Sequence, residues 1–277
     1  LISENNLDAS SIKASGKDNR ITKADVVNHL DAKDQAPKTD HNLSQPVSNR
    51  PEKRVSMTRL RSTIAKRLVS VQQETAMLTT FNEVDMKPIM DLRAKYKQAF
   101  ATHHEVNLGF MSFFTKAVTE ALNLFPSVNG QIDGKEIILH DYADIGVAVS
   151  SPKGLMVPVV RNAEQMSLAE IEREIKRLAI KARDGKITPD EMTGGTFTIT
   201  NTGSRGALFD TPIINQPQVA ILGLGAVVKR PMVMKGTDGG ETIAVRSMVY
   251  LGLSYDHRIV DGADAARFLV TLKDRLE

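Results

Sequence analysis

The chain contains no cysteine and no tryptophan, and only 5% of its residues are aromatic. The absence of cysteine excludes disulfide bonds, cysteine nucleophiles and thiolate metal sites, and it fits a reducing compartment. No apolar run approaches the roughly 18–20 residues of a membrane-spanning helix. Charge of one sign is also scarce, since 36 Lys and Arg face 33 Asp and Glu and leave a net charge of +3. So small a surplus gives little support to nucleic-acid binding, and we expect neither a membrane nor a nucleic-acid partner.

What is present divides the 277 residues into three stretches. Residues 1–30 form a small unit in which Val26, Val27 and Leu30 have helical spacing. Residues 31–53 are polar, carry three prolines and are predicted to be a flexible linker. From residue 54 to residue 277 the apolar content stays high enough for one large domain. Because the chain begins at Leu1 and not Met, we expect a fragment whose N-terminal part has been removed.

Helices and strands interleave in the large domain without strict alternation. Thr58 can cap a helix that carries Leu60, Ile64, Leu68 and Val71 on one side, and Ser167 with Glu170 forms a capping box. Further helices are predicted at 85–100, 109–124, 167–183 and 262–276, and strands at 77–84, 136–139, 145–150, 155–160, 196–201, 219–228 and 247–253. The pattern predicts an α/β fold of the α+β kind, in which helices cover a mixed sheet, and not a doubly wound parallel sheet.

One short motif concentrates the chemistry of the chain. Residues 254–262 read SYDHRIVDG, which places His257 between two acids after an apolar strand and before a helix. An imidazole titrates near neutrality and can serve as a general base without a large pKa shift. A lone histidine beside an aspartate is more often a hydrogen-bonded structural group, so both interpretations stay open on the pattern alone. No second ligand follows at metal-binding spacing, so a metal site is not expected.

Other motifs are weaker. Residues 194–203 are either an ordinary strand that ends in a turn or a strand end at which a hydroxyl or backbone donor binds an oxyanion, and the pattern alone leaves both open. The Gly223-Leu224-Gly225 segment lacks the third glycine and the helix of a dinucleotide-binding motif. The His103-His104 pair is predicted to lie in a solvated loop. The basic residues between 59 and 67 are predicted to be the solvated face of a helix.

Together these segments resemble a known family. Residues 256–262 (DHRIVDG) resemble the active-site signature of the dihydrolipoamide acyltransferases, which form the cores of the 2-oxo acid dehydrogenase complexes. Residues 7–13 and 18–26 resemble the peripheral subunit-binding domain of that family, in which Arg20 matches a partner-contact position. We therefore expect a partial subunit-binding domain at 1–30, a linker at 31–53 and a catalytic acyltransferase domain at 54–277.

Within the family, the segments differ in the branch they resemble. Residues 75–88, 108–113 and 211–215 are similar to the succinyltransferase of the 2-oxoglutarate dehydrogenase complex. Residues 201–210, Arg230 and the 235–240 loop are similar to another branch that includes acetyl-transferring members. The chain is therefore either a natural sequence with features of both branches or a mosaic of two sequences. Succinyl transfer is the function that the resemblance favours. Acetyl transfer in the pyruvate dehydrogenase complex and a non-catalytic scaffold core remain alternatives.

The resemblance also implies a site and an assembly. In this family His257 acts as the general base on the coenzyme A thiol, Thr200 donates a hydrogen bond to the oxyanion, and Asp261 organises the site. The family fold is that of chloramphenicol acetyltransferase, a homotrimer with its active site between subunits. The implied cofactor is lipoate on a lipoyl domain, which we expect to be absent from this chain, with coenzyme A as substrate and no metal.

The resemblance finally implies partners and a compartment. The expected partners are further copies of the chain in a trimer or a larger cubic core, the 2-oxo acid decarboxylase and dihydrolipoamide dehydrogenase. The expected location is the bacterial cytoplasm or the mitochondrial matrix.

Overall fold

The computed structural model describes residues 12–16, 20–27, 52–152, 154–236 and 239–277. The chain divides into two units, Leu1–Ser56 and Met57–Glu277. Most of the predicted subunit-binding domain and linker lies outside the described residues. In the part of the first unit that is described, residues 23–27 are helical, and Ile12 and Val26 are buried.

Asp25 organises this part of the first unit. Its carboxylate accepts hydrogen bonds from the backbone and the hydroxyl of both Ser15 and Thr22, at 2.6–3.1 Å. The bonds from Ser15 and Thr22 hold the pKa of the Asp25 carboxyl well below its usual range, against a smaller opposing effect of burial. A buried carboxylate with so many donors fixes the start of the helix.

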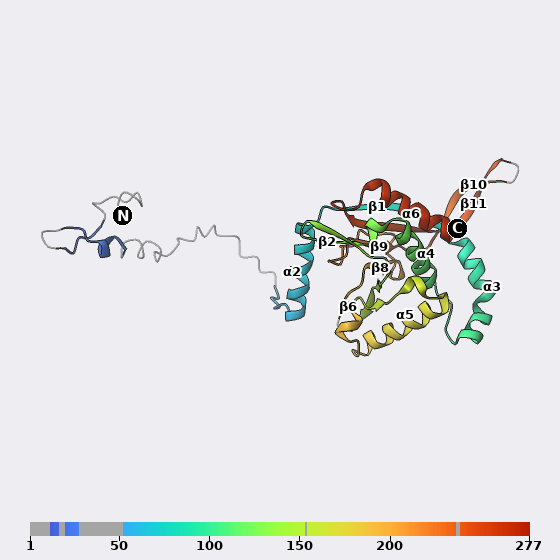
Figure 1. The fold of residues 1–277 in the computed structure, drawn as a ribbon, viewed down its shortest axis with the longest axis horizontal. Coiled ribbons are helices and arrows are strands. Elements are labelled where there is room, and N and C mark those ends of the chain that lie inside the picture. Colours follow the sequence, from blue (N-terminus) through green and yellow to red (C-terminus); the bar gives the residue numbers. More distant parts are fainter. Residues whose placement is uncertain (1–11, 17–19, 28–51, 153, 237–238) are drawn as a thin grey trace. The chain divides into compact units, whose positions relative to one another are not determined.

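The second unit contains a mixed sheet with helices against it (Figure 1). Its helices are α2 (Arg59–Glu74), α3 (Lys87–His104), α4 (Met111–Leu124), α5 (Leu168–Arg183) and α6 (Gly262–Leu276). Its strands are β1 (Met77–Asp85), β2 (Gly130–Asp133), β3 (Glu136–Leu139), β4 (Ile145–Val147), β5 (Val149–Ser151), β6 (Gly154–Met156), β7 (Val159–Val160), β8 (Phe197–Asn201), β9 (Ala220–Leu224), β10 (Val228–Lys235) and β11 (Glu241–Asp256). The predicted α/β architecture with a mixed sheet is confirmed.

The main sheet has the order β1-β11-β9-β8-β4-β7, and β10 pairs with the outer part of β11. β8 runs parallel to β9 and to β4, whereas β11 is antiparallel to β1, β9 and β10. The hydrophobic core is built from alternate sheet residues such as Leu222 and Leu253, from Phe268 of α6 and from Phe114 of α4. These side chains are almost fully excluded from solvent, and their burial provides the main stabilisation of the unit.

The two faces of the central strands differ in chemistry, because side chains alternate along a strand. The face opposite the core carries the row Thr200, Gly223, Gly252 and Phe81, which are neighbours in register. Two of these four positions are glycines, so chain segments can approach this face closely. One face of the sheet therefore packs into the hydrophobic core, and the opposite face contacts a loop and carries Thr200.

Local signals predicted the helix boundaries well. The Thr58 side chain accepts a hydrogen bond from Arg61 N at the start of α2, and Ser167 with Glu170 completes the capping box of α5. The last helix has the bounds that the sequence indicated. However, the stripe on α2 is only partly buried: Val71 is covered, whereas Leu60 and Leu68 are 55% and 42% exposed.

Some local predictions were wrong. His103 and His104 form the last turn of α3 and not a loop, because histidine suits a helix C-terminus and Glu105 ends the helix in a left-handed conformation. The 145–150 and 155–160 segments each divide into two short strands. The 219–228 segment ends at Leu224, and the β10–β11 hairpin was not foreseen. In β10 and in the first part of β11, most residues are exposed, and their composition resembles that of a loop.

Candidate active site

His257 lies directly after β11, and its backbone is fixed by the start of β1. The His257 N–H donates to the carbonyl of Ala76 at 2.9 Å, and the Ala76 N–H donates to an Asp256 carboxylate oxygen at 3.3 Å. These bonds join segments about 180 residues apart in the chain. The side chain of His257 remains 43% exposed, so the imidazole is accessible to a substrate.

Asp256 holds the turn that carries His257. Its side chain is 2% exposed and accepts from the backbone N–H of Arg258 at 3.1 Å and from the Arg258 guanidinium at 2.6 Å. Burial raises the pKa of the Asp256 carboxyl, but the hydrogen bonds and charge of Arg258 outweigh burial and leave this pKa below its usual range. The Asp256 side chain is therefore a buried carboxylate with a fixed cationic partner. The motif did not reveal this positioning pair, although the acid and arginine flank the histidine.

Asp261 occupies the N-cap position of α6, four residues after His257. Its carboxylate lies 3.9 Å from His257 Nδ1, beyond hydrogen-bond distance, and its side chain is 84% exposed. This contact involves Nδ1, so the other ring nitrogen, Nε2, faces away from Asp261. The geometry suits an organising role for Asp261 better than a direct proton transfer.

Thr200 lies on the central strand β8, and the structure does not bring it near His257 of the same chain. Thr200 is paired with Gly223, and Gly223 with Gly252, which is five residues before His257 on β11. At about 3.4 Å per residue, this offset is about 17 Å along the strands, and two strand spacings add about 10 Å across them. One substrate atom cannot contact both side chains within a single chain.

The loop after Thr200, at residues 202–210, packs directly against two glycines of the neighbouring chain segment, Gly223 and Gly225. The sequence did not reveal this contact. A Cβ atom on Gly225 would lie 2.0 Å from the carbonyl oxygen of Leu208, and one on Gly223 would lie 2.7 Å from a carboxylate oxygen of Asp210. Contacts this short are possible only where no side chain is present. Gly223 and Gly225, which fail as a dinucleotide motif, therefore serve to let this loop approach the sheet next to Thr200.

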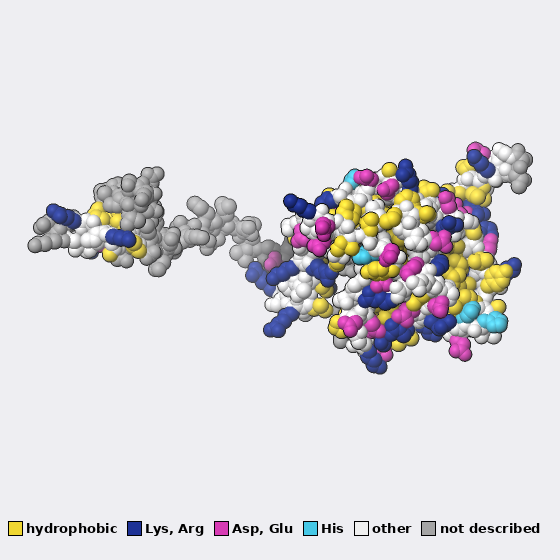
Figure 2. All heavy atoms as spheres, viewed as in Figure 1, with side chains coloured by type: hydrophobic (Ala, Val, Ile, Leu, Met, Phe, Trp, Pro, Cys, Tyr) yellow, Lys and Arg dark blue, Asp and Glu magenta, His cyan; other side chains and the backbone are white. Residues whose placement is uncertain are grey.

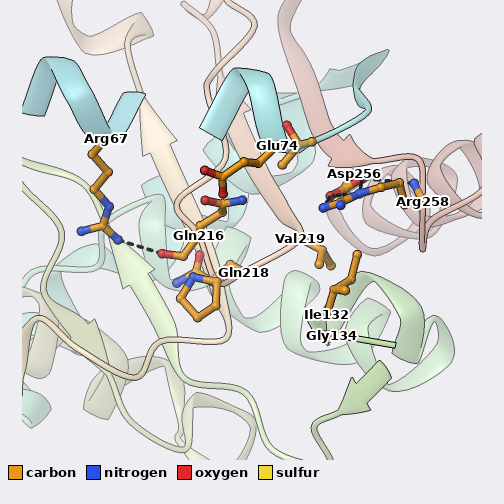
Figure 3. A pocket seen from close by; sticks show the side chains of 11 residues that line it. Arg67, Glu74, Ile132, Gly134, Gln216, Gln218, Val219, Asp256 and Arg258 are labelled. Atoms are coloured by element: carbon orange, nitrogen blue, oxygen red, sulfur yellow. Dashed lines mark hydrogen bonds and ion pairs between the residues drawn. The ribbon is translucent and has the colours of Figure 1, made fainter. Parts of the chain in front are cut away.

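An open groove of about 640 Å³ lies beside the histidine turn. It is lined by residues of α2, the β2–β3 turn and the segment before β9, together with Asp256 and Arg258 (Figure 3). Arg67 of α2 reaches across it and donates to the carbonyl of Gln216 at 2.7 Å. Glu74 lies between Arg67 and Arg258. The hydrogen bond from Arg258 to Asp256 raises the pKa of Arg258, burial lowers it, and the charge of Glu74 adds a smaller increase.

The remaining candidate residues have simpler surroundings. Arg20 is exposed in the first unit. Within the ranges that the structure describes, no group of three or more His, Asp or Glu is placed to hold a metal ion. No helix in those same ranges is long and apolar enough to cross a membrane.

Comparisons with known proteins agree with these features. Residues 49–277 match the model of the 2-oxoacid dehydrogenases acyltransferase catalytic domain, and residues 1–27 match the e3 binding domain. The dihydrolipoyllysine-residue succinyltransferase component of the 2-oxoglutarate dehydrogenase complex from Escherichia coli K12 is 52% identical over all of this chain and 68% of its own length. The same component from Pseudomonas aeruginosa is 54% identical over all of this chain and 69% of its length.

Solved structures show the same fold. A probable dihydrolipoamide acetyltransferase from Listeria monocytogenes is 40% identical with a TM-score of 0.76, over 81% of this chain and 94% of that one. The cubic core of the pyruvate dehydrogenase multienzyme complex is 36% identical with a TM-score of 0.76, over 82% of this chain and 91% of that one. The chain belongs to the 2-oxoacid dehydrogenase acyltransferase family.

Proposed function

We propose that this protein transfers a succinyl group between dihydrolipoamide and coenzyme A, as the core component of a 2-oxoglutarate dehydrogenase complex of the tricarboxylic acid cycle. The observation that carries the proposal is an accessible histidine, whose backbone Ala76 holds beside the Asp256–Arg258 pair, in a chain that is 50–54% identical throughout its length to several succinyltransferase components. The similar relatives are bacterial, which favours the cytoplasm as the location.

In the proposed reaction, Nε2 of His257 takes the proton of the coenzyme A thiol. A thiol pKa lies about two units above that of free imidazole, so this transfer is uphill by roughly 2.7 kcal/mol, which a positioned base can overcome during attack. The thiolate attacks the succinyl thioester carbonyl and forms a tetrahedral oxyanion. The intermediate then expels the dihydrolipoyl thiolate, which takes the proton back from the His257 imidazolium. The two substrates supply both sulfur atoms, in agreement with a chain that has no cysteine.

Thr200 is proposed to donate a hydrogen bond to this oxyanion from a neighbouring copy of the chain. One such donor contributes about 3–4 kcal/mol in acyl transfer. The separation of Thr200 from His257 within one chain supports a site shared between two subunits of a homotrimer. The solved cubic core among the similar structures supports further assembly of the trimers. The similar solved structure of Azotobacter vinelandii dihydrolipoamide acetyltransferase, 36% identical, addresses the role of a serine, a histidine and an asparagine in its catalytic mechanism, which supports catalytic roles for a hydroxyl and a histidine here.

Partner binding is assigned to the first unit. The match of residues 1–27 to an e3 binding domain supports docking of dihydrolipoamide dehydrogenase, with Arg20 as a contact residue. The decarboxylase component is the second proposed partner. Acetyl transfer is the second candidate reaction, because the similar solved structures at 36–40% identity include acetyltransferases.

Two measurements test this function. His257→Ala is expected to abolish transfer and to leave the trimer intact by sedimentation, since the His257 side chain is 43% exposed; unchanged turnover would refute the base assignment. Comparison of succinyl-CoA with acetyl-CoA as donors to dihydrolipoamide is expected to give the higher kcat/KM for succinyl-CoA. A preference for acetyl-CoA would favour the second candidate, and no transfer with either would favour a scaffold.

A further inference from the structure

One acidic side chain lies close to Thr200 on the face of the sheet opposite the core. Gly223 is the register partner of Thr200, and a Cβ atom on Gly223 would lie 2.7 Å from Asp210 Oδ1. A Cβ atom on Gly252, the next residue of that row, would lie 3.0 Å from the backbone oxygen of Asp210. Since neighbouring strands are about 5 Å apart, Asp210 Oδ1 lies about 8 Å at most from the Cβ atom of Thr200.

The Asp210 carboxylate has no partner in the folded chain. Its Oδ1 atom is buried without a hydrogen bond, and among the described residues no cation forms an ion pair with it. Its surroundings are apolar, because Pro212 also borders the space above Gly223 and Phe81 borders the space above Gly252. A carboxylate that lacks both a donor and a cation, in apolar surroundings, exerts its charge strongly on any group placed beside it.

Arg230 is a cation of the same face of the sheet, but it is engaged elsewhere. Its guanidinium donates to the Glu83 carboxylate at 2.6 Å and to the Tyr250 hydroxyl at 2.8 Å. It also lies over the Tyr250 ring, with the guanidinium carbon 4.6 Å from the ring centroid. A guanidinium held by a carboxylate, a hydroxyl and an aromatic ring is not free to neutralise Asp210 or to bind a substrate carboxylate.

An acyl group bound at Thr200 extends its chain close to this carboxylate. Its carbonyl oxygen accepts from the Thr200 hydroxyl at about 2.8 Å. In a succinyl group, three bonds of about 1.5 Å separate the carbonyl carbon from the terminal carboxylate carbon, which spans about 4 Å. The terminal carboxylate therefore enters the space between Thr200 and Asp210, where two negative charges about 5 Å apart repel each other. An acetyl group ends at its methyl group and places no charge there.

We propose that Asp210 is a specificity-determining residue of the acyl site, which disfavours acyl groups that end in a carboxylate and leaves short uncharged acyl groups unaffected. The proposal rests on the proposed function, because it concerns the acyl group that this reaction transfers. In that reaction, Asp210 narrows the preference for succinyl over acetyl without reversing it. An uncharged side chain at the same position widens this preference.

The test measures kcat/KM for succinyl-CoA and acetyl-CoA as donors to dihydrolipoamide. Asp210→Asn keeps the size of the side chain and removes its charge, and it is expected to raise the succinyl-to-acetyl ratio about tenfold with an unchanged value for acetyl-CoA. Asp210→Ser is expected to shift the ratio in the same direction, which separates the loss of charge from the presence of an amide. Butyryl-CoA has the chain length of succinyl without its charge, and its ratio to acetyl-CoA is expected to stay constant.

Salt and a matched control variant provide two further readouts. Because salt screens the repulsion, a higher salt concentration is expected to raise the succinyl-to-acetyl ratio in the wild type and to change it less in Asp210→Asn. Asp274 is exposed on α6, whose buried side chains pack into the core on the other face of the sheet. Acidic and basic side chains are interspersed on the visible face of the second unit (Figure 2), so one neutralised acid has little long-range effect. Asp274→Asn is therefore expected to leave the ratio unchanged.

An unchanged ratio in both Asp210 variants, an equal shift in Asp274→Asn, or an equal gain for butyryl-CoA would each overturn the proposal. A wild type that prefers acetyl-CoA would sink the succinyl assignment, and a ratio that still rises in Asp210→Asn would support the role of Asp210. Equilibrium dialysis of succinyl-CoA and acetyl-CoA against the wild type and Asp210→Asn needs no turnover. Even in a chain without transfer activity, tighter binding of succinyl-CoA alone by the variant would support the proposal, and unchanged binding would overturn it.

Discussion

The separation of Thr200 from His257 along the sheet makes a quantitative prediction about mixed trimers. If the site combines His257 of one subunit with Thr200 of the next, an inactive His257 variant and a strongly impaired Thr200 variant must complement each other. His257→Ala keeps a native threonine, and Thr200→Ala keeps a native histidine. A site with both native residues forms wherever a Thr200→Ala subunit supplies its histidine to a His257→Ala neighbour.

The size of the effect follows from threefold symmetry. When equal amounts of the two chains assort at random, about three quarters of the trimers contain both variants, and each of these has one native site in three. The mixture is therefore expected to regain about a quarter of the wild-type rate. Alone, His257→Ala is expected to be inactive, and Thr200→Ala to keep about one hundredth to one thousandth of the wild-type kcat, the usual loss for one oxyanion donor.

The assay unfolds the two variants together, refolds them and measures transfer of succinyl groups to coenzyme A. Different affinity tags on the two chains allow the mixed trimers to be isolated, and in that fraction the expected rate is about a third of wild type. Variants refolded separately and then combined serve as the control, since their subunits have not exchanged. Mixed trimers with no more activity than the separate variants would refute the shared site, and Thr200 would then lose its proposed role.

Three further predictions concern stability and are measured by chemical unfolding. Asp256→Asn is expected to cost about 2–3 kcal/mol at neutral pH, because it removes the charged partner of Arg258. The pKa of Asp256 is depressed in the folded state, so its contribution is complete above the unfolded pKa of about 4 and is lost as the pH falls through the folded pKa; a difference from wild type that persists undiminished at pH 2 would contradict this. Gly225→Ala is expected to cost more than about 2 kcal/mol, since the new Cβ meets the Leu208 carbonyl oxygen, and wild-type stability would show that the loop is not seated there. Ser167→Ala removes half of a capping box and is expected to cost about 1 kcal/mol, with Ser167→Asp as the variant that restores it.

Much of the fold was readable because its signals are local. The capping residues Thr58 and Ser167 act on N–H groups three residues away, so their helices begin where the sequence indicated. The last helix also has the bounds that the sequence indicated. Sequence failed where pairing decides the structure: the outer half of β11 is a strand because β10 lies against it, and the 145–150 segment divides because its two parts pair with different partners.

The sequence by itself determined the chemistry of this protein, and the tertiary structure decided where that chemistry takes place. Residues 254–262 identify the histidine and the acids around it, since their order along the chain is the information. The backbone that holds His257 is the segment at Ala76, which lies about 180 residues away in the chain. The offset between Thr200 and His257 depends on the register of three strands. Register is a property of pairing between distant segments, and no single segment of the chain contains it.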